Sequence, residues 1–249
     1  MRAADGASTS GRIGCSPSQT LLLAVPGHIR LRHRRRRNVL GIQPLRCSAS
    51  ANGKLQGPVV LVDNYDSFTY NLSQYLGDLG CQHIVFKNDE KTVKEIASMN
   101  PRGILVSPGP GRPEDSGISL QIVQELGPRI PVFGVCMGHQ CIGQIFGGRI
   151  IRAPKGVMHG KTSLVYHNNT SLLRGLDNPF EAARYHSLVI EKESCPDDLE
   201  VTAWTEDGII MGVQHKQHAH IQGVQFHPES VITYQGKTIV QNFIDALDG

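Results

Sequence analysis

The chain has 249 residues, of which 39% are hydrophobic and 19% charged, and its formal net charge is +3. This length accommodates one or two domains. No run approaches the ~20 apolar residues of a transmembrane helix, which argues against a helical membrane protein. The 6 cysteines form no C-x-x-C pair and are too sparse for a disulfide framework, which fits a reducing compartment.

The first 57 residues differ in composition from the rest. They hold ten basic side chains and a single acid, Asp5, whereas residues 58–249 hold 15 basic and 21 acidic side chains. An Arg- and Ser-rich segment nearly free of acids is typical of an organelle transit peptide. Its apolar run, residues 21–25, is too short for a secretory signal and precedes the Arg cluster. A basic nuclear or nucleic-acid-binding arm and a solvated tail are the other interpretations.

From residue 58 onward, short β-rich runs alternate with helical patterns. The runs predicted as strands are residues 59–62, 83–86, 103–106 and 131–135. The segments with helical periodicity are residues 68–79, 92–99, 118–126 and 138–146. This alternation predicts right-handed crossovers and a mostly parallel sheet covered by helices on both faces.

After Gly148 the pattern changes to strands in hairpins. The β-rich runs here are residues 162–166, 200–204, 209–214 and 221–225, and a last helix is expected over about residues 237–247. We therefore predict an α/β fold with a mostly parallel, flavodoxin-like central sheet and an added β-rich hairpin region. Residues 58–249 are expected to form one domain, and residues 1–57 a transit peptide and disordered leader. The acidic balance of this domain argues against a nucleic-acid partner.

Residues 134–138 have the pattern G-x-C-x-G, with Cys136 at the centre, between a predicted strand and a predicted helix. Such glycines let the backbone turn sharply, as in a nucleophile elbow, and leave the central side chain exposed at the carboxyl end of a sheet. The amino end of the following helix points at the sulfur and favours thiolate over thiol. Cys136 is therefore the predicted nucleophile, and an inert core cysteine is the alternative.

His227 lies 91 positions after Cys136, near the end of a predicted strand, and Glu229 follows two positions later. An extended backbone puts residues i and i+2 on one side, so Glu229 can orient the imidazole while its other nitrogen meets the sulfur. These three residues match the Cys-His-acid pattern of acyl transfer. A surface His-Pro-Glu turn is the alternative interpretation.

Several other residues are weaker candidates. His139 is close to Cys136 in sequence, but as the third residue after it in the helix it should lie beside the site. Cys141 has no elbow context and is expected in the core. The histidines at 215, 218 and 220 invite a metal interpretation, yet they lack Cys or acidic partners at ligand spacing. A solvated hairpin is predicted there instead, and no metal or cofactor is expected.

Residues 107–111, 134–140 and 223–230 resemble, in order, the three signature segments of class I (triad) glutamine amidotransferases. A fourth block, residues 63–72, is similar to the amidotransferase subunits that feed ammonia to chorismate-using synthases, above all the anthranilate synthase beta subunits. The resemblance runs from about residue 58 to the end of the chain. One such block would be weak evidence, whereas four in the family's order are specific.

The resemblance implies further site residues. The N–H groups of Gly109 and Met137 would form the oxyanion hole, where donors must meet the charge that builds on the tetrahedral oxygen. The residues implied in holding glutamine are Gly109, Pro110, Gly111, Gln140, Ser187 and Leu188. An ordinary tight turn is the alternative interpretation of the Pro/Gly loop.

The implied reaction is glutamine hydrolysis through a thioester of Cys136. Ammonia would pass to a separate chorismate-binding alpha subunit that makes anthranilate, within a heterodimer or heterotetramer, for tryptophan biosynthesis. The amidotransferase component of aminodeoxychorismate synthase, on the folate route, is the alternative, since its motifs are nearly the same. No nucleic-acid or membrane partner is expected.

Other classes fit less well. Carbamoyl-phosphate and GMP synthetases share the triad but not the block 63–72. A non-catalytic scaffold would be expected to lack a triad member, and a cysteine peptidase would not need Gln140 and Ser187. Fold analogy alone could not choose among these. The leader together with the plant-type resemblance favours the chloroplast stroma over the mitochondrion.

Overall fold

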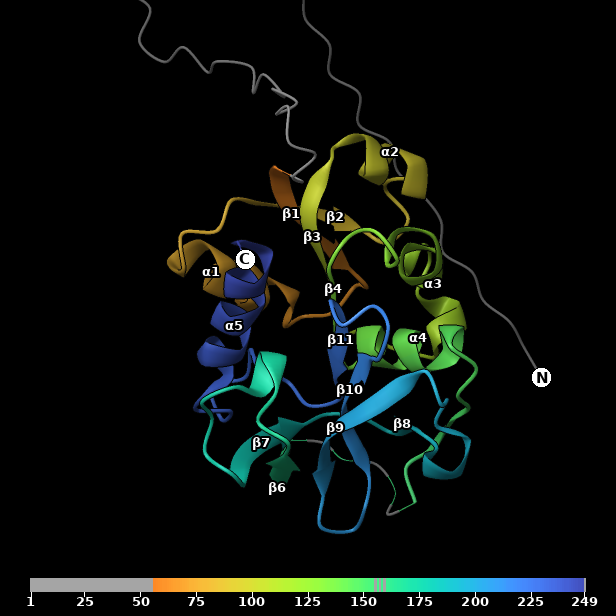
Figure 1. Ribbon diagram of the computed structural model, residues 1–249, viewed down its shortest axis with the longest axis vertical. Helices are drawn as coiled ribbons and strands as arrows, with labels where there is room; N and C mark the ends of the chain where they lie inside the picture. The colour runs from red at the N-terminus through yellow and green to blue at the C-terminus, as the bar shows by residue number, and fades with distance from the viewer. Residues whose placement is uncertain (1–55, 155, 157, 159, 249) are drawn as a thin grey trace, which may run out of the picture. The chain divides into compact units, whose positions relative to one another are not determined.

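The computed structural model describes residues 56–154, 156, 158 and 160–248. The predicted leader, residues 1–57, lies outside the described residues except for its last two. Among the described residues, one large sheet runs in the order β2-β1-β3-β4-β11-β10-β9-β6-β7, and β5 pairs only with β8 (Figure 1).

The first five strands of that order are parallel to one another. They are β2 (His83–Lys87), β1 (Gly57–Asp63), β3 (Pro101–Val106), β4 (Val132–Val135) and β11 (Ile221–Val224). We call these strands the parallel half. Four of them are strands that the sequence predicts with small shifts at the ends, and the fifth, β11, comes from the predicted hairpin region.

The remaining strands pair antiparallel and continue the same sheet. They are β10 (Ile210–His215), β9 (Leu199–Thr205), β6 (Lys161–His167) and β7 (Phe180–Arg184), and we call them the antiparallel half. The separate pair consists of β5 (Ile150–Arg152) and β8 (Leu188–Ile190). The sequence does not predict β5, β7 or β8, because two of them span three residues and β7 carries two alanines and two charges.

Helices cover both faces of the parallel half. Helices α1 (Thr69–Asp78) and α5 (Gly236–Asp248) lie side by side on one flank, and α3 (Ser119–Gln121) and α4 (Met137–Ile145) lie on the other (Figure 1). The further helical segments are α2 (Val93–Ser98), the π-turn η2 (Ile122–Leu126) and the 3₁₀ turns η1 (Pro113–Asp115), η3 (Ser171–Leu173) and η4 (Lys192–Ser194). The helix predicted over residues 118–126 is thus one α turn that widens into a π-turn.

Strand β1 buries side chains on both faces of the parallel half. Val59 and Leu61 point into the core beneath α1 and α5, whereas Val60 and Val62 point into the core beneath α2 and α4. All four side chains are fully buried, as the unbroken apolar run of a parallel strand predicts. In the part of the chain that the structure describes, no helix has the length and apolar character needed to cross a membrane.

Strand β11 joins the two halves of the sheet. It runs parallel to β4, with Val224 opposite Val135, and antiparallel to β10, with Val224 opposite Gly212. Because β4 and β11 are parallel neighbours, the residues that follow both strands emerge at the same edge of the sheet. Cys136 follows β4 and His227 follows β11, so the fold brings the two predicted reactive residues to one place.

Candidate active site

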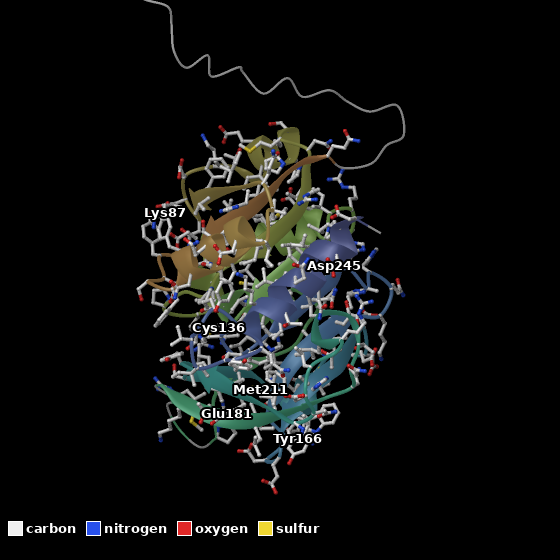
Figure 2. All side chains as sticks on the ribbon, turned by 90° about the vertical axis from the view of Figure 1, so that its left-hand side faces the viewer. Lys87, Cys136, Tyr166, Glu181, Met211 and Asp245 are labelled. Carbon is white, nitrogen blue, oxygen red and sulfur yellow. The ribbon has the colours of Figure 1, made fainter. Side chains whose placement is uncertain are left out.

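Cys136 occupies the sharp turn between β4 and α4. Its backbone has φ 51° and ψ −95°, a conformation that residues other than glycine rarely adopt. Its N–H donates to the carbonyl of Val224 on β11 at 2.8 Å, and its own carbonyl accepts from the N–H of Gln140 at 3.0 Å. In the view of Figure 2, Cys136 lies below Lys87, at the end of β2, and above Glu181, on β7. The predicted turn is therefore present, and hydrogen bonds on both sides hold it. The prediction that the Cys136 side chain is exposed is wrong, because the residue is buried against its neighbours.

The glycines of the elbow are required by close backbone contacts. A Cβ atom on Gly134 would lie 2.4 Å from the backbone carbon of Gly138, and one on Gly138 would lie 2.5 Å from the carbonyl oxygen of Val106. Any side chain at these positions would push α4 away from the sheet. The glycines thus keep α4 close to the sheet, with Cys136 as the residue that precedes its first turn.

His227 and Glu229 form a buried pair. Nδ1 of His227 and Oε1 of Glu229 are 2.6 Å apart, and both side chains are almost wholly buried. The backbone of His227 is held from two sides, because its N–H donates to Ala183 on β7 at 3.0 Å and its carbonyl accepts from the Thr233 hydroxyl at 2.7 Å. This is the i, i+2 arrangement that the sequence predicts, and it is not an exposed turn.

The charges around His227 favour its protonated form. Burial by itself lowers the pKa of the imidazole, but the Cys136 sulfur and the Glu229 carboxylate outweigh burial and hold that pKa well above its usual value. Nε2 makes no hydrogen bond of ordinary length among the described residues, yet it is close enough to the Cys136 sulfur for that sulfur to stabilise the imidazolium. The site can therefore hold an imidazolium whose free N–H is available to a leaving group.

The loop after β3 carries Gly109 to the same edge. A Cβ atom on Gly109 would lie 2.5 Å from the Cβ atom of Asn64, so glycine is required for this approach. Asn64 also bonds Ser107 twice, through its N–H to the hydroxyl at 2.9 Å and through its side-chain amide to the carbonyl at 3.0 Å. Its side-chain oxygen, Oδ1, accepts from Asn88 and Ser119. Asn64 thus fixes the loop, a role that the sequence pattern did not predict although the residue lies in block 63–72.

The N–H groups of Gly109 and Met137 are free of backbone partners. Neither donates to a backbone carbonyl of the described residues. Met137 is the first residue of α4, where N–H groups have no acceptor one turn earlier. Both groups are therefore available to an oxyanion.

The other predicted glutamine-binding residues are divided between the surface and the interior. Pro110 and Gly111 are not buried, and Gly111 has φ 84°. Gln140 is buried, and its amide nitrogen donates to the carbonyl of Leu188 at 3.2 Å. Ser187 lies just before β8, and its carbonyl accepts from Ala153 at 2.8 Å. Gln140 and Leu188 are thus in direct contact, as joint members of one site would be.

The rival residues lie in other environments. Burial lowers the pKa of His139 to about 4, so its imidazole is neutral, and burial raises the pKa of the Cys141 thiol to about 12. His215 is buried, so the predicted solvated hairpin is wrong at this residue, and its Nδ1 stabilises the turn by accepting the N–H groups of Gln217 and His218. Among the described residues, no group of three or more His, Cys, Asp or Glu side chains could hold a metal ion.

Gln225 also lies against the nucleophile, which the sequence pattern did not predict. Its amide nitrogen is 3.5 Å from the sulfur of Cys136, and its side chain is fully buried. A polar residue between Val224 and Phe226, just after a buried strand, was the available signal, because buried amides need partners.

Comparisons with known proteins identify the family of this chain. A family model described as glutamine amidotransferase class-I matches residues 60–247. The anthranilate synthase beta subunit 1, chloroplastic, of Arabidopsis thaliana is 62% identical over 201 residues, which cover 79% of this chain and 73% of the relative. The anthranilate synthase component 2 of Cyanophora paradoxa is 58% identical over 190 residues, which cover 76% of this chain and all of the relative.

A solved structure of a GMP synthase component from Thermoplasma acidophilum superposes with a TM-score of 0.66 over 78% of this chain and 95% of that chain. At 24% sequence identity this likeness shows the fold alone. The family model spans the elbow, the loop after β3 and the His227–Glu229 pair. The chain therefore belongs to the class I glutamine amidotransferase family.

Proposed function

We propose that this chain is the glutaminase component of an anthranilate synthase and supplies ammonia to a chorismate-binding subunit. The observation that carries the proposal is the meeting of a strained cysteine elbow and a buried His–Glu pair at the carboxyl ends of two adjacent parallel strands. The relatives named anthranilate synthase beta subunit or component 2 favour this role over the aminodeoxychorismate synthase of the folate route.

The proposed chemistry begins with attack of the Cys136 thiolate on the side-chain amide carbon of glutamine. The N–H groups of Gly109 and Met137 stabilise the oxygen that takes up the electron pair. When the tetrahedral intermediate collapses, the C–N bond breaks, and protonated His227 gives its proton to the departing nitrogen. The products of this half-reaction are ammonia and a thioester.

The second half-reaction restores the enzyme. Neutral His227 takes a proton from water, and the resulting hydroxide attacks the thioester carbon. The C–S bond breaks, the new carboxyl group gives its proton to solvent, glutamate leaves, and Cys136 returns as thiolate beside the imidazolium. Glu229 holds the imidazole through Nδ1 in both steps, so that Nε2 always faces the reacting atoms. Gln140, Ser187 and Leu188 would hold the amino-acid end of glutamine.

The surface beside this site fits a protein partner. Val231 and Tyr234, which follow Glu229, are 91% and 94% exposed, and Tyr65 and Tyr70, which follow β1, are also exposed. The two segments are joined where the Asn71 side chain donates to the carbonyl of Glu229 at 3.5 Å. We call these four exposed side chains the rim patch. Exposed apolar clusters commonly mark protein interfaces, and ammonia is best passed to a protein docked at the site that releases it.

The proposal extends to the assembly and its compartment. The complex is a heterodimer or heterotetramer with the chorismate-binding subunit, and the compartment is the plastid stroma. Relatives from Arabidopsis thaliana and Oryza sativa carry the word chloroplastic in their names, which supports the plastid. Removal of the leader on import is tested by sequencing the amino terminus of the native protein. A mature chain that keeps the Arg run at 34–37 would exclude the transit peptide.

The central test is the Cys136→Ala variant in the reconstituted complex. Glutamine-dependent synthesis of anthranilate is expected to disappear, because no thioester can form, while synthesis from ammonium salts stays intact. Reconstitution with the large subunit of aminodeoxychorismate synthase is the comparison for the route. Appreciable glutamine turnover by Cys136→Ala would refute the role of the cysteine, and activity only with the folate-route partner would move the assignment there.

A further inference from the structure

A chain of buried hydrogen bonds ends at the sulfur of Cys136. The amide nitrogen of Gln140 donates to the carbonyl of Leu188 at 3.2 Å and to Oε1 of Gln225 at 3.2 Å. The amide nitrogen of Gln225 then lies 3.5 Å from the sulfur. The three side chains of Gln140, Gln225 and Cys136 are all buried, so water does not compete strongly for these bonds.

The donor and acceptor of every hydrogen bond in this series are determined at the end that lies farthest from the sulfur, the carbonyl of Leu188. A backbone carbonyl can only accept, so Gln140 must turn its nitrogen, not its oxygen, toward Leu188. That same nitrogen then requires the oxygen of Gln225 as its second acceptor. The nitrogen of Gln225 consequently faces Cys136, and the sulfur meets an N–H donor.

Two further residues, Arg184 and His186, hold the carbonyl of Leu188 in place. Nε of Arg184 donates to Nε2 of His186 at 3.0 Å, and because Arg has only donors, this nitrogen of His186 must be the acceptor. Nδ1 of His186 therefore carries the proton and donates to the carbonyl of Leu188 at 3.1 Å. Burial and the adjacent Arg184 charge lower the pKa of His186 to about 3, so this neutral tautomer persists across the physiological range.

We infer that Gln225 is a catalytic residue that stabilises the Cys136 thiolate through its amide N–H, and that Gln140 is a positioning residue that aims this donor. The inference rests on the proposed role of Cys136 as nucleophile. A hydrogen bond donated to the charged form of a group favours that form. An amide serves well here because it has no charge to pair with Glu229 and no proton to exchange with His227.

The first test is the reactivity of Cys136 in the Gln225→Met variant of the full chain, which keeps the side-chain length and removes the donor. Iodoacetamide alkylation is followed from pH 5 to 9 by mass spectrometry of the peptide that contains Cys136. Cys141, whose buried thiol has a pKa of about 12, lies in the same peptide and serves as the unreactive reference. We expect alkylation at pH 7 to slow by about tenfold, because a hydrogen bond to a charged group is lost.

The pH profile separates this effect from a structural one. The ionisable groups that interact with His227 or with the far end of the hydrogen-bond series are Glu229 after β11, His139 on α4, and Arg184 and His186 at and after the end of β7. None of them is altered in Gln225→Met, so a lower alkylation rate across the whole pH range reports the loss of the amide donor. Glutaminase kcat should fall with little change in KM, since the donor contacts the nucleophile.

Gln222→Met is the matched control, because Gln222 is a buried amide on β11 whose oxygen accepts from Leu172 at 3.4 Å, away from the sulfur. Its alkylation profile should equal that of the unmodified chain. Gln140→Met provides a second test that leaves the contacts of the sulfur intact, and it should slow alkylation by about threefold because Gln225 is no longer aimed.

The outcomes separate this inference from the proposed function. Unchanged alkylation profiles in both Gln225→Met and Gln140→Met would overturn the inference while leaving Cys136 as nucleophile. Slower alkylation in Gln222→Met as well would also overturn it, because the effect would then come from any buried amide of this strand. If Cys136→Ala kept its glutaminase activity, the proposed function itself would fail.

Discussion

The parallel and antiparallel halves of the large sheet contribute different parts of the candidate site. The parallel half supplies the reactive groups at strand ends: Gly109 follows β3, Cys136 follows β4, and His227 follows β11. The antiparallel half supplies residues that hold the site in place. The carbonyl of Ala183 on β7 accepts the N–H of His227, and Arg184 and His186, at and after the end of β7, start the series of hydrogen bonds that ends at the sulfur.

The difference follows from how each half is connected. Parallel strands all end at the same edge, where the amino ends of the following helices also lie, so that edge collects donors and nucleophiles. Antiparallel strands end alternately at opposite edges. Here β7 contacts the site through the backbone carbonyl of Ala183, and the segment after β7 contributes the buried side chain of His186. The parallel half therefore supplies the reactive groups together with the side chains that orient them, Glu229, Gln225 and Gln140, and the antiparallel half supports these residues.

The largest effect is expected from removing the charge that orients the base. Glu229→Gln should lower glutaminase kcat by about 10³- to 10⁴-fold, as the loss of the acid does in other triads. The pKa of His227, which Glu229 helps to raise, should fall, and NMR titration of the imidazole would detect this. Glu181→Gln, an exposed position on β7, is the control and should leave both quantities unchanged. Equal kcat for the two variants would show that Glu229 has no part in the reaction.

Two glycine substitutions test the close packing of the parallel half, because one should lower and the other should raise the free energy of unfolding. Gly138→Ala should lower the free energy of unfolding by about 3 kcal/mol, because its Cβ would lie 2.5 Å from the carbonyl oxygen of Val106. Gly77→Ala, in α1, meets nothing closer than 3.8 Å and should raise that free energy by about 0.5–1 kcal/mol. Denaturant unfolding measures both. A tolerated Gly138→Ala would mean that α4 is not held against the sheet as described.

The buried histidine of α4 should make the protein sensitive to mild acid. The folded-state pKa of His139 is lowered to about 4 by burial, so its contribution to stability is present above the unfolded-state value and is lost as pH falls toward 4. His139→Leu should remove about 2–3 kcal/mol of the decline in unfolding free energy between pH 7 and pH 4. Denaturant unfolding of variant and parent across this pH range measures the difference. Parallel stability curves for the two proteins would contradict this account.

The smallest effect is expected at the rim patch. Tyr234→Ser should weaken binding of the chorismate-binding subunit by about tenfold, which is about 1.4 kcal/mol, without changing the stability of the isolated chain. Leu164→Ser, at an exposed apolar position on β6 of the antiparallel half, should have no effect on binding. Surface plasmon resonance measures both affinities. If Leu164→Ser weakened binding and Tyr234→Ser did not, the docking surface would lie on the antiparallel half instead.

Much of the parallel half could be predicted from the sequence. Its strands are unbroken apolar runs, and its helices carry apolar residues at helical spacing, as in α1, where Leu72 and Leu76 are fully buried. The elbow could be recognised from its G-x-C-x-G pattern, although Gly138 is required by the close approach of Val106 on β3 rather than by the turn alone. The antiparallel half was less predictable, since β7 is stabilised by its neighbours rather than by residues that favour strands.

The sequence by itself determined the alternation of strands and helices, the elbow at Cys136 and the local pairing of His227 with Glu229, because each depends on residues only a few positions apart. Only the tertiary structure decided that β11 lies beside β4, and hence that the pair meets the cysteine 91 positions away. It also decided that Asn64 fixes the loop of Gly109 and that Gln225 faces the sulfur. These contacts join segments distant in the chain, and their partners are selected by packing and by the need of buried polar groups for hydrogen bonds.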